Sequence, residues 1–380
     1  MIQKPIKVPF VDLRWQHQPL SADLQQAITS VVERGDFVLG QAVTEFESSF
    51  AAACGMEWAV GVASGTDAIA LGLKACGIGQ GDEVLVPTNT FIASVIAVLQ
   101  AGATPILVDC DPQTALIDLD LAVESLTPRT RAVLPVHLYG QMVSPKQLKD
   151  FADTHHLTIF EDAAQSHLAS RESYYAGTIG QAAAFSFYPS KNLGAFGNGG
   201  IVVTNDEQIA KKVRSLRNYG APRKYYHTEL GTNSRLDTIQ AAILQVKLPC
   251  LTEWNQQRNW AAQQYETGFQ SLINSGLILP IRNDSGTGHV YHLYVIRLGK
   301  SFEEKREEIQ QKLASKGIQT GIHYPVPCHL QSAYQFLGHR SGDFPQAEKL
   351  SAQILSLPMY PGLKSDQIDW VVEQCHDILN

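Results

Sequence analysis

The feature of this sequence that most constrains its fold is an alternation of short apolar runs and amphipathic segments between residues 58 and 204. Seven of the runs have the length and composition of β-strands, and helical segments such as 67–76 and 145–155 link the first five. A chain that alternates strands and helices forms a mainly parallel sheet with helices on both faces. We therefore predict an α/β fold with a seven-stranded sheet, whose strands lie at 58–62, 84–87, 105–108, 132–136, 157–161, 182–188 and 200–204.

Further elements are predicted on both sides of this alternation. Before it, Thr44 has the pattern of an N-cap for a helix over 45–54, and Glu47 completes a capping box. The other predicted elements are helices at 20–32, 206–217, 236–248, 251–272, 301–316 and 365–379, and strands at 291–298 and 319–323. Because the alternation stops after residue 204, we predict a large α/β domain over 1–250 and a smaller α+β domain over 251–380. The long helix that starts at residue 251 would be the hinge.

Composition and charge argue against several classes of protein. No apolar run approaches the roughly 20 residues that span a bilayer, and Met1–Pro5 does not look like the start of a secretory signal. We therefore expect a cytoplasmic protein without a membrane partner. The formal net charge of −7 argues against a nucleic-acid partner, whose binding domain would carry a basic face. The six cysteines form no CxxC motif, so we predict neither a metal site nor a disulfide scaffold.

Two ionisable residues at the ends of predicted strands are the strongest candidates for chemistry. The run at 157–161 leads to Asp162 and the run at 182–188 leads to Lys191, where open α/β sheets place their ligand-binding residues. The apolar, glycine-rich residues around Lys191 would lower the pKa of its amine toward the nucleophilic neutral form. This pairing suits pyridoxal phosphate, which needs a lysine amine for its aldehyde and a carboxylate for its pyridine nitrogen. The alternative is a loop lysine beside a core strand, although such surroundings usually mark a site.

Other residues near these strand ends could hold the same cofactor. Gly65 and Thr66 lie where the first strand meets a helix, so backbone N–H groups and the Thr66 hydroxyl could bind the phosphate, although the pattern also fits a plain N-cap. Phe91 follows the next strand and is either a ring-stacking residue or an ordinary core phenylalanine. Ser186 could add a phosphate contact, and Gln165 could bind the ring hydroxyl.

Short motifs spread over nearly the whole chain lead to a family resemblance. The motifs are FVLG at 37–40, SGT at 64–66, TFIA at 90–93, HLYG at 137–140, EDAAQ at 161–165, FSFYPSKNLG at 185–194, GTNSRLD at 231–237 and HYP at 323–325. With them the chain resembles the DegT/DnrJ/EryC1/StrS family, the sugar aminotransferases of the fold-type-I pyridoxal-phosphate class. Two positions depart from the family pattern, because Leu168 replaces a usual glycine and Asn198 a usual acidic residue. These departures affect the expected loop shape and substrate fit more than the chemistry.

The resemblance implies a role for each candidate residue. Lys191 is implied as the Schiff-base lysine and general acid/base, with Asp162 as the pyridinium partner. Ala164 is implied on the ring face opposite Phe91, and Asn233 reaches the phosphate from the neighbouring subunit, which implies a homodimer with shared active sites. The full set of implied cofactor-binding residues is Gly65, Thr66, Phe91, Asp162, Ala164, Gln165, Ser186, Lys191 and Asn233.

The resemblance also implies the reaction, in which an amine passes from L-glutamate to a nucleotide-linked keto-deoxyhexose, with dTDP as the favoured nucleotide. The segment 217–229 is rich in charge and aromatics, so it could clasp a diphosphate and sugar or be a solvated loop. Its similarity to the corresponding loop of enzymes that aminate C3 favours a 3-aminotransferase over a 4-keto-sugar aminotransferase. Candidate substrate-binding residues are Tyr219, Arg223, Lys224, Tyr225, His323 and Tyr324, although the last two could simply order a turn.

One alternative lies outside enzyme chemistry, since some relatives were first described as regulators. A non-catalytic pyridoxal-phosphate-binding regulatory protein would be expected to lose the lysine, and Lys191 is present. A related dehydratase branch replaces this lysine with histidine, so the same residue argues against deoxygenation chemistry.

Overall fold

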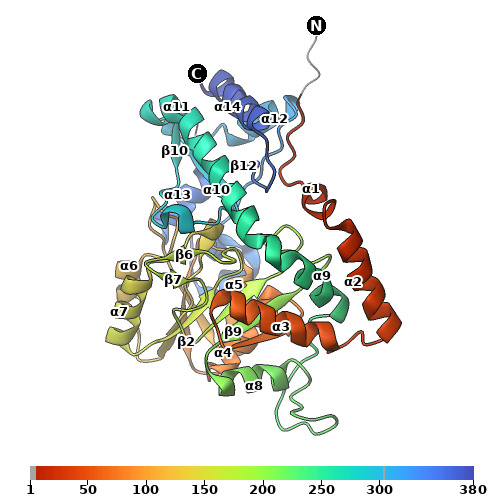
Figure 1. Ribbon diagram of the computed structural model, residues 1–380. Helices are drawn as coiled ribbons and strands as arrows, with labels where there is room; N and C mark the ends of the chain where they lie inside the picture. The colour runs from red at the N-terminus through yellow and green to blue at the C-terminus, as the bar shows by residue number, and fades with distance from the viewer. Residues whose placement is uncertain (1–5, 303) are drawn as a thin grey trace.

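The computed structural model describes residues 6–302 and 304–380, and a seven-stranded sheet forms its centre (Figure 1). The strand order is β1-β9-β8-β5-β4-β2-β3, and β9 alone among these seven strands runs antiparallel to its neighbours. The predicted α/β fold with a mainly parallel seven-stranded sheet is therefore confirmed. The strands are β1 (Trp58–Val62), β2 (Glu83–Pro87), β3 (Thr104–Val108), β4 (Thr130–Val133), β5 (Thr158–Asp162), β8 (Ala182–Ser186) and β9 (Gly200–Thr204).

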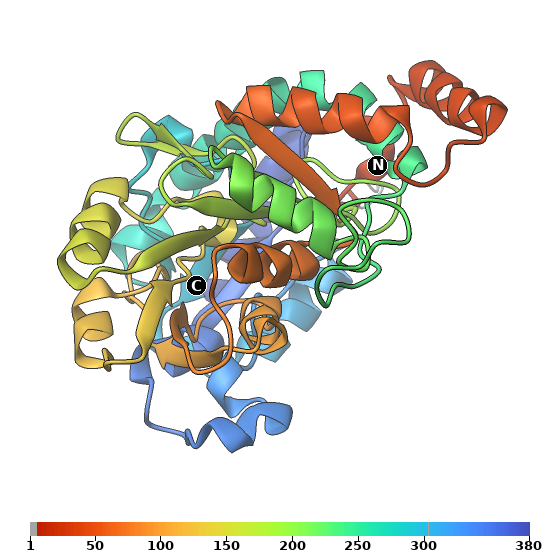
Figure 2. The same ribbon diagram turned by 90° about the horizontal axis from the view of Figure 1, so that it is seen from below.

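Helices cover both faces of this sheet (Figure 2). On one face α4 (Gly65–Ala75) packs on β8 and β9 and contacts α8 (Glu207–Leu216), while α3 (Gln41–Cys54) packs on β1 and on α9 (Thr238–Lys247). The remaining helices of this part are α1 (Leu13–His17), α2 (Ser21–Arg34), α5 (Ala93–Ala101), α6 (Leu119–Glu124) and α7 (Pro145–His155). Three of the five residues of β8 are alanines, which lets α4 lie close to the sheet and brings its first turn to Ser186.

The helix before the sheet starts earlier than the sequence pattern predicts, so the predicted capping box of Thr44 and Glu47 is wrong. The helix α3 begins at Gln41, whose backbone N–H donates to the Asp36 carboxylate at 2.9 Å. Glu47 instead points into the core, where Oε1 accepts a hydrogen bond from the Gly61 N–H at 2.8 Å and pairs with Arg217. The side chain that accepts from the start of α3 is therefore Asp36, which lies before the predicted capping box. Glu47 instead stabilises contacts with distant parts of the chain.

This buried ion pair gives a prediction about stability. Arg217→Met is expected to lower the free energy of unfolding by about 3–5 kcal/mol, because the Glu47 carboxylate would stay buried without its counter-charge. Chemical denaturation of the purified variant measures the loss. Lys211→Met is the matched control, since Lys211 lies on α8, which Arg217 directly follows, in an exposed pair with Glu207 that is worth at most about 1 kcal/mol. Equal losses in the two variants would contradict the prediction.

The C-terminal part of the chain builds a second, smaller sheet. It is antiparallel and contains β10 (Ile278–Pro280), β11 (Tyr294–Leu298) and β12 (Ile354–Leu357). The predicted strand at 291–298 is present in shortened form, whereas 319–323 makes one isolated bridge through Gly321 and is not a strand. The helices here are α10 (Leu251–Gly268), α11 (Gln270–Asn274), α12 (Arg306–Ser315), α13 (Pro345–Gln353) and α14 (Ser365–Leu379).

The second sheet has its own hydrophobic core, which also includes Val8 from the N-terminal segment. Val8 donates to the Gly317 carbonyl at 2.9 Å and accepts from the Gln319 N–H at 3.0 Å. The N-terminal segment therefore packs on the C-terminal sheet, and the division of the chain at residue 250 stays a prediction.

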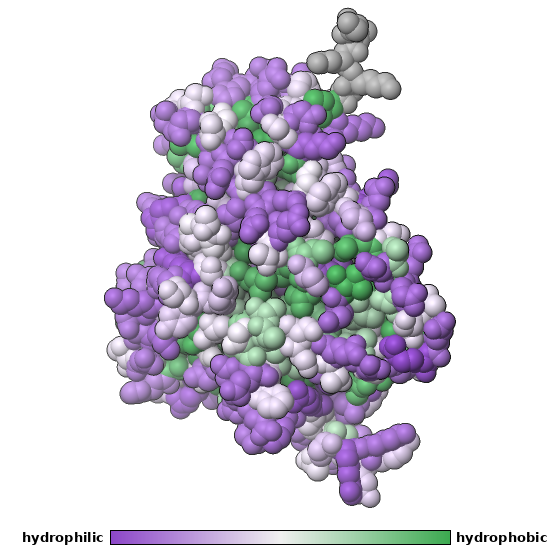
Figure 3. Space-filling model, in the orientation of Figure 1, coloured by the Kyte–Doolittle hydropathy of each residue, from purple (hydrophilic) through white to green (hydrophobic). Residues whose placement is uncertain are grey.

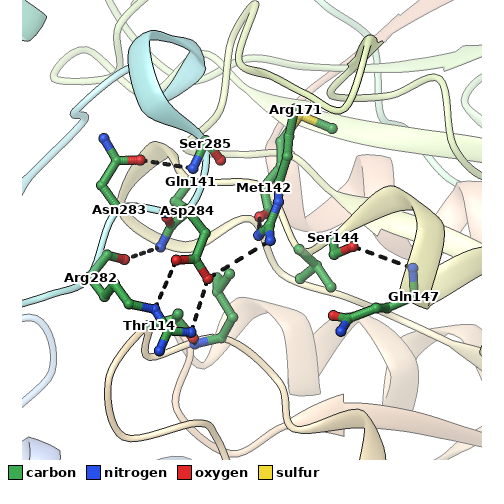
Figure 4. A network of polar contacts seen from close by, with 12 residues as sticks. Thr114, Gln141, Met142, Ser144, Gln147, Arg171, Arg282, Asn283, Asp284 and Ser285 are labelled. Carbon is green, nitrogen blue, oxygen red and sulfur yellow. Dashed lines mark hydrogen bonds and ion pairs between the residues drawn. The ribbon is translucent and has the colours of Figure 1, made fainter.

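Polar contacts fasten the segment after β10 to the loops of the large sheet (Figure 4). Arg282 donates from Nε and Nη2 to the Asp284 carboxylate at 2.8 and 3.0 Å. The Gln141 side chain accepts from the Asp284 N–H at 2.6 Å and donates to the Arg282 carbonyl at 3.0 Å. Arg171 lies 3.8 Å from Asp284 and donates to the Met142 carbonyl at 3.0 Å. Arg171, Arg282 and Asp284 border a cavity of about 440 Å³, and the Asp284 carboxylate pairs with both arginines.

The surface is mainly polar in the view of Figure 3, with apolar side chains gathered near the middle of that face. Over residues 6–302 and 304–380, no helix combines the length and apolar character that a membrane crossing needs.

Candidate active site

A cavity of about 440 Å³ lies beside the carboxyl ends of β5 and β8 and contains both predicted catalytic residues. Most of the other predicted site residues also line it. The predicted residues in its wall are Gly65, Thr66, Phe91, Asp162, Ala164, Gln165, Ser186, Lys191, His323 and Tyr324. The structure therefore brings together residues from positions 65 to 324 at one edge of the sheet, as parallel topology requires.

Asp162 ends β5 and is buried, with a hydrogen bond to each carboxylate oxygen. Oδ1 accepts from the Ala164 N–H at 3.1 Å, and Oδ2 accepts from the Ser94 hydroxyl at 2.7 Å. Burial raises the pKa of this carboxyl, while the bonds from Ser94 and Ala164 and the charge of Lys191 lower it. The two donors thus favour the charged form in a place where burial alone would favour the neutral acid.

Lys191 lies in the loop after β8, and its side chain is half-buried. Its backbone N–H donates to the Tyr188 carbonyl at 2.8 Å, which forms a tight turn. The amine makes no hydrogen bond or ion pair with the part of the chain that the structure describes. Desolvation lowers the pKa of the Lys191 amine to about 8, against the opposing effect of the Asp162 charge. About a tenth of the amine is therefore neutral and nucleophilic at pH 7, far more than for an ordinary lysine.

The first turn of α4 borders the same cavity and fits an anion. Ser64 caps the helix by accepting from the Asp67 N–H at 3.1 Å, so the N–H groups of Gly65 and Thr66 lie in the first turn, where they have no partner within the helix. A Cβ added to Gly65 would lie 2.7 Å from the Cβ of Ser186. Glycine is thus required for the helix start to approach Ser186. The positive end of the helix and the hydroxyls of Thr66 and Ser186 face one cavity.

Aromatic and amide groups form another part of the wall. The ring centroids of Phe91 and Tyr324 are 5.4 Å apart, and 52% of Phe91 is exposed, so it is not an ordinary core phenylalanine. Gln165 accepts from the Tyr139 N–H at 2.7 Å and donates to the Tyr324 hydroxyl at 3.1 Å, which fixes the orientation of its amide. Tyr139 also donates to the His323 carbonyl at 2.6 Å.

His292 lines the cavity and was not predicted from the sequence. Its Nδ1 lies 3.2 Å from the Asn192 side-chain oxygen, while the Asn192 amide nitrogen donates to the Asn255 oxygen and the Val290 carbonyl, both at 2.9 Å. The proton therefore lies on Nδ1 of His292, and Nε2 is the acceptor. Burial keeps the pKa of His292 well below its ordinary value, so the ring is neutral. No local sequence signal distinguished it from a core histidine.

The donor set of this cavity fits pyridoxal phosphate. A phosphate matches the first turn of α4, a protonated pyridine nitrogen matches the buried Asp162 carboxylate, and an aldehyde matches the Lys191 amine. The helix start, the carboxylate and the amine differ in chemistry, and each matches a different group of the cofactor. The match therefore does not depend on any one of them.

Several predicted residues lie outside this cavity. Asn233 lines a neighbouring cavity of about 440 Å³, and Asn198 lines both. The loop between residues 218 and 232 projects from the molecule (Figure 1), and 80% of Tyr225 is exposed. The predicted substrate residues in this loop do not reach the Lys191 cavity of their own chain; they are Tyr219, Arg223, Lys224 and Tyr225. Leu168 has a φ of 60°, in the left-handed region that favours the glycine usual in the family.

Comparisons with known proteins agree with the geometry. The model of the DegT/DnrJ/EryC1/StrS aminotransferase family matches residues 19–376. The dTDP-3-amino-3,4,6-trideoxy-alpha-D-glucose transaminase of Streptomyces venezuelae is 45% identical over 367 residues, which cover 97% of this chain and 95% of that protein. The structure of S. venezuelae DesV in complex with a ketimine intermediate has a TM-score of 0.93 at 44% identity and covers 98% of this chain and 99% of that chain. Bacillus subtilis NtdA with bound cofactor PMP has a TM-score of 0.92 at 32% identity, with 100% and 87% covered. This chain belongs to the DegT/DnrJ/EryC1/StrS aminotransferase family.

Proposed function

We propose that the protein is a pyridoxal-phosphate-dependent aminotransferase that moves the amine of L-glutamate to C3 of a dTDP-linked keto-deoxyhexose. The observation that carries the proposal is one cavity that holds a lysine amine without a partner among the described residues, a buried carboxylate and a helix start suited to phosphate. The substrate class is supported by the S. venezuelae transaminase, whose name specifies a dTDP-linked 3-amino sugar, and by the structural similarity to DesV. The cofactor is supported by NtdA, which was solved with PMP.

Each of the cavity residues has a separate role in such a reaction. When bound, pyridoxal phosphate supplies the electron sink and the carrier for the amine. Lys191 holds the cofactor and then moves a proton at its Nζ atom, since an amine with a pKa near 8 both accepts and donates protons near neutral pH. The Asp162 carboxylate keeps the pyridine nitrogen protonated, and the first turn of α4 fixes the phosphate. Gln165 donates from its oriented amide toward the ring oxygen.

The proposal includes a homodimer with shared active sites. Asn233 and the exposed residues of the 218–232 loop lie outside the cavity of their own chain, where a second copy could use them. Arg223 and Lys224 in this loop would meet the diphosphate of the sugar nucleotide, and Tyr219 and Tyr225 would add ring contacts. His323 and Tyr324 would contact the substrate from within the same chain, because both line the cavity.

The reaction can be tested with a panel of keto-sugar nucleotides. The protein loaded with pyridoxal phosphate is expected to convert L-glutamate to 2-oxoglutarate in the presence of a dTDP-linked 3-keto-deoxyhexose, and NMR of the product should place the amine on C3. The matching 4-keto sugars and UDP-linked sugars form the rest of the panel. Transfer to 4-keto sugars alone would replace the proposal with a 4-aminotransferase. A protein that binds the cofactor but transfers no amine to any sugar would favour the regulatory alternative.

A further inference from the structure

Two buried hydroxyl groups, those of Ser94 and Thr90, form hydrogen bonds in series with the Asp162 carboxylate. Ser94, in the first turn of α5, lies 2.7 Å from Asp162 Oδ2, and Thr90 Oγ1 lies 2.9 Å from the Ser94 hydroxyl. The exposed fractions of these three residues are 1% for Ser94, 3% for Thr90 and 5% for Asp162. The three side chains therefore form a chain of hydrogen bonds shielded from water.

The direction of these hydrogen bonds follows from the number of protons. An ionised carboxylate only accepts, so the single hydroxyl proton of Ser94 is donated to Asp162. The Phe91 carbonyl is a weaker alternative acceptor at 3.3 Å. Because Ser94 has no second proton to give, the Thr90 hydroxyl must donate to the Ser94 oxygen. Both hydroxyls thus point their protons toward the carboxylate, and each bond polarises the next.

Ser94 does not serve as a helix cap, which is the usual task of a serine at a helix start. The N-cap residue of α5 is Ile92, which makes no side-chain capping bond. The Ser94 hydroxyl is therefore committed to Asp162, and the positive end of α5 lies on the same side of the carboxylate. The Ala164 N–H supplies the bond to the other oxygen from the chain just after Asp162.

We propose that Ser94, supported by Thr90, is a positioning residue that keeps Asp162 ionised and aimed at the pyridine nitrogen of the cofactor. The inference rests on the proposed function. A proton between Asp162 and the nitrogen resides on the nitrogen only if the carboxylate is the weaker base of the two. Ser94 weakens that base by stabilising its charge. Without the hydroxyl, the proton should move from the nitrogen toward the carboxylate, and the electron sink should weaken.

The test measures the protonation of the nitrogen directly. The protein is loaded with pyridoxal phosphate labelled with ¹⁵N in the ring, and the ¹⁵N chemical shift is read at neutral pH in the wild type and in Ser94→Ala. The wild type should show a protonated nitrogen. In Ser94→Ala the ratio of protonated to unprotonated nitrogen should fall by about tenfold, because one charge-assisted hydrogen bond is lost. Asp162→Asn removes the negative charge and gives the limit of the unprotonated form.

Three further variants separate this role from a structural one. Ser94→Thr keeps the hydroxyl and should restore the wild-type shift. Thr90→Val should move the resonance in the same direction as Ser94→Ala but less far. Ser166→Ala removes another buried hydroxyl near Asp162, one that donates to the Ala163 carbonyl at 3.2 Å, and should leave the shift unchanged. If Ser94→Ala fails to fold, Thr90→Val carries the test.

The outcomes are distinct for the inference and for the proposed function. A resonance in Ser94→Ala and Thr90→Val that matches the wild type, while Asp162→Asn moves it, overturns the inference alone. A wild-type protein that binds no pyridoxal phosphate overturns the proposed function and the inference with it. An unchanged resonance in Asp162→Asn overturns the role of Asp162, and hence that of Ser94.

Discussion

Replacement of Lys191 by alanine is expected to lower the rate of amine transfer by roughly 10²–10⁴-fold, the contribution of a well-placed general acid/base. The Lys191 amine lines the cavity and has no hydrogen-bond or ion-pair partner among residues 6–302 and 304–380, and its pKa of about 8 lets it exchange protons near neutral pH. Single-turnover kinetics of the variant with L-glutamate measure the loss. In the wild type, reduction with borohydride followed by peptide mapping should find the cofactor covalently attached to Lys191.

Lys247 provides an internal control for this prediction. Burial also lowers the pKa of the Lys247 amine to about 8, and only 1% of the residue is exposed. Its amine, however, donates to the Gly194 carbonyl and lies 3.2 Å from His17 Nε2, and the residue does not line the Lys191 cavity. Reduction should therefore leave Lys247 unlabelled. Label on Lys247, or an Lys191→Ala variant with unchanged single-turnover rates, would refute the assignment of Lys191.

The large sheet could be predicted because its buried strands leave a clear pattern. Most are mainly apolar runs with turn residues near their ends, and the predicted bounds of β1 and β9 coincide with those of the structure. In the C-terminal part the pattern is weaker. Residues 354–357 form β12, but they follow α13 directly with no turn residue between, so the apolar run reads as part of a helix.

Only the site residues that belong to a recognisable local sequence pattern could be predicted. Asp162 and Lys191 stand at the ends of recognisable strands, and Gly65 and Thr66 stand at a strand-to-helix turn. Ser94 and His292 gain their roles from partners far along the chain. Ser94 contacts Asp162 across 68 positions and His292 contacts Asn192 across 100. A serine in a helix, or a histidine just before a strand, carries no local sign of such contacts.

Mixing two inactive variants is expected to restore activity, on the proposal that Asn233 acts in the active site of a partner subunit. Asn233 is exposed and lines a cavity next to that of Lys191, which is where a second copy could use it. Action within one chain has its own support. Ser234 accepts from the Ala63 N–H at 3.1 Å and donates to Asp67 at 2.8 Å, so Asn233 also lies near the phosphate-binding turn of its own chain.

The two arrangements differ in what a mixed dimer contains. Asn233→Asp should be nearly inactive alone, because its new carboxylate would face the phosphate dianion at close range. If Asn233 acts in trans, a dimer of an Lys191→Ala chain and an Asn233→Asp chain has one site with both changes and one intact site. Random reassembly of equal amounts should then return about a quarter of the wild-type sites. If Asn233 acts within its own chain, every site carries one change and no activity returns.

A second pair of variants is the control. It shows whether recovered activity comes from a site shared between subunits or from the unfolding and reassembly procedure itself. Lys191→Ala and Asp162→Asn change two residues that line one cavity of one chain, so every site in their mixed dimer carries one change. That mixture should stay as inactive as its parents after the same unfolding and reassembly. Recovery in the Asn233 mixture alone would place Asn233 in the partner's site. An Asn233 mixture no more active than the sum of its two homodimers would assign the residue to its own chain, where the next residue, Ser234, is bonded to Ala63 and Asp67 on either side of Gly65 and Thr66.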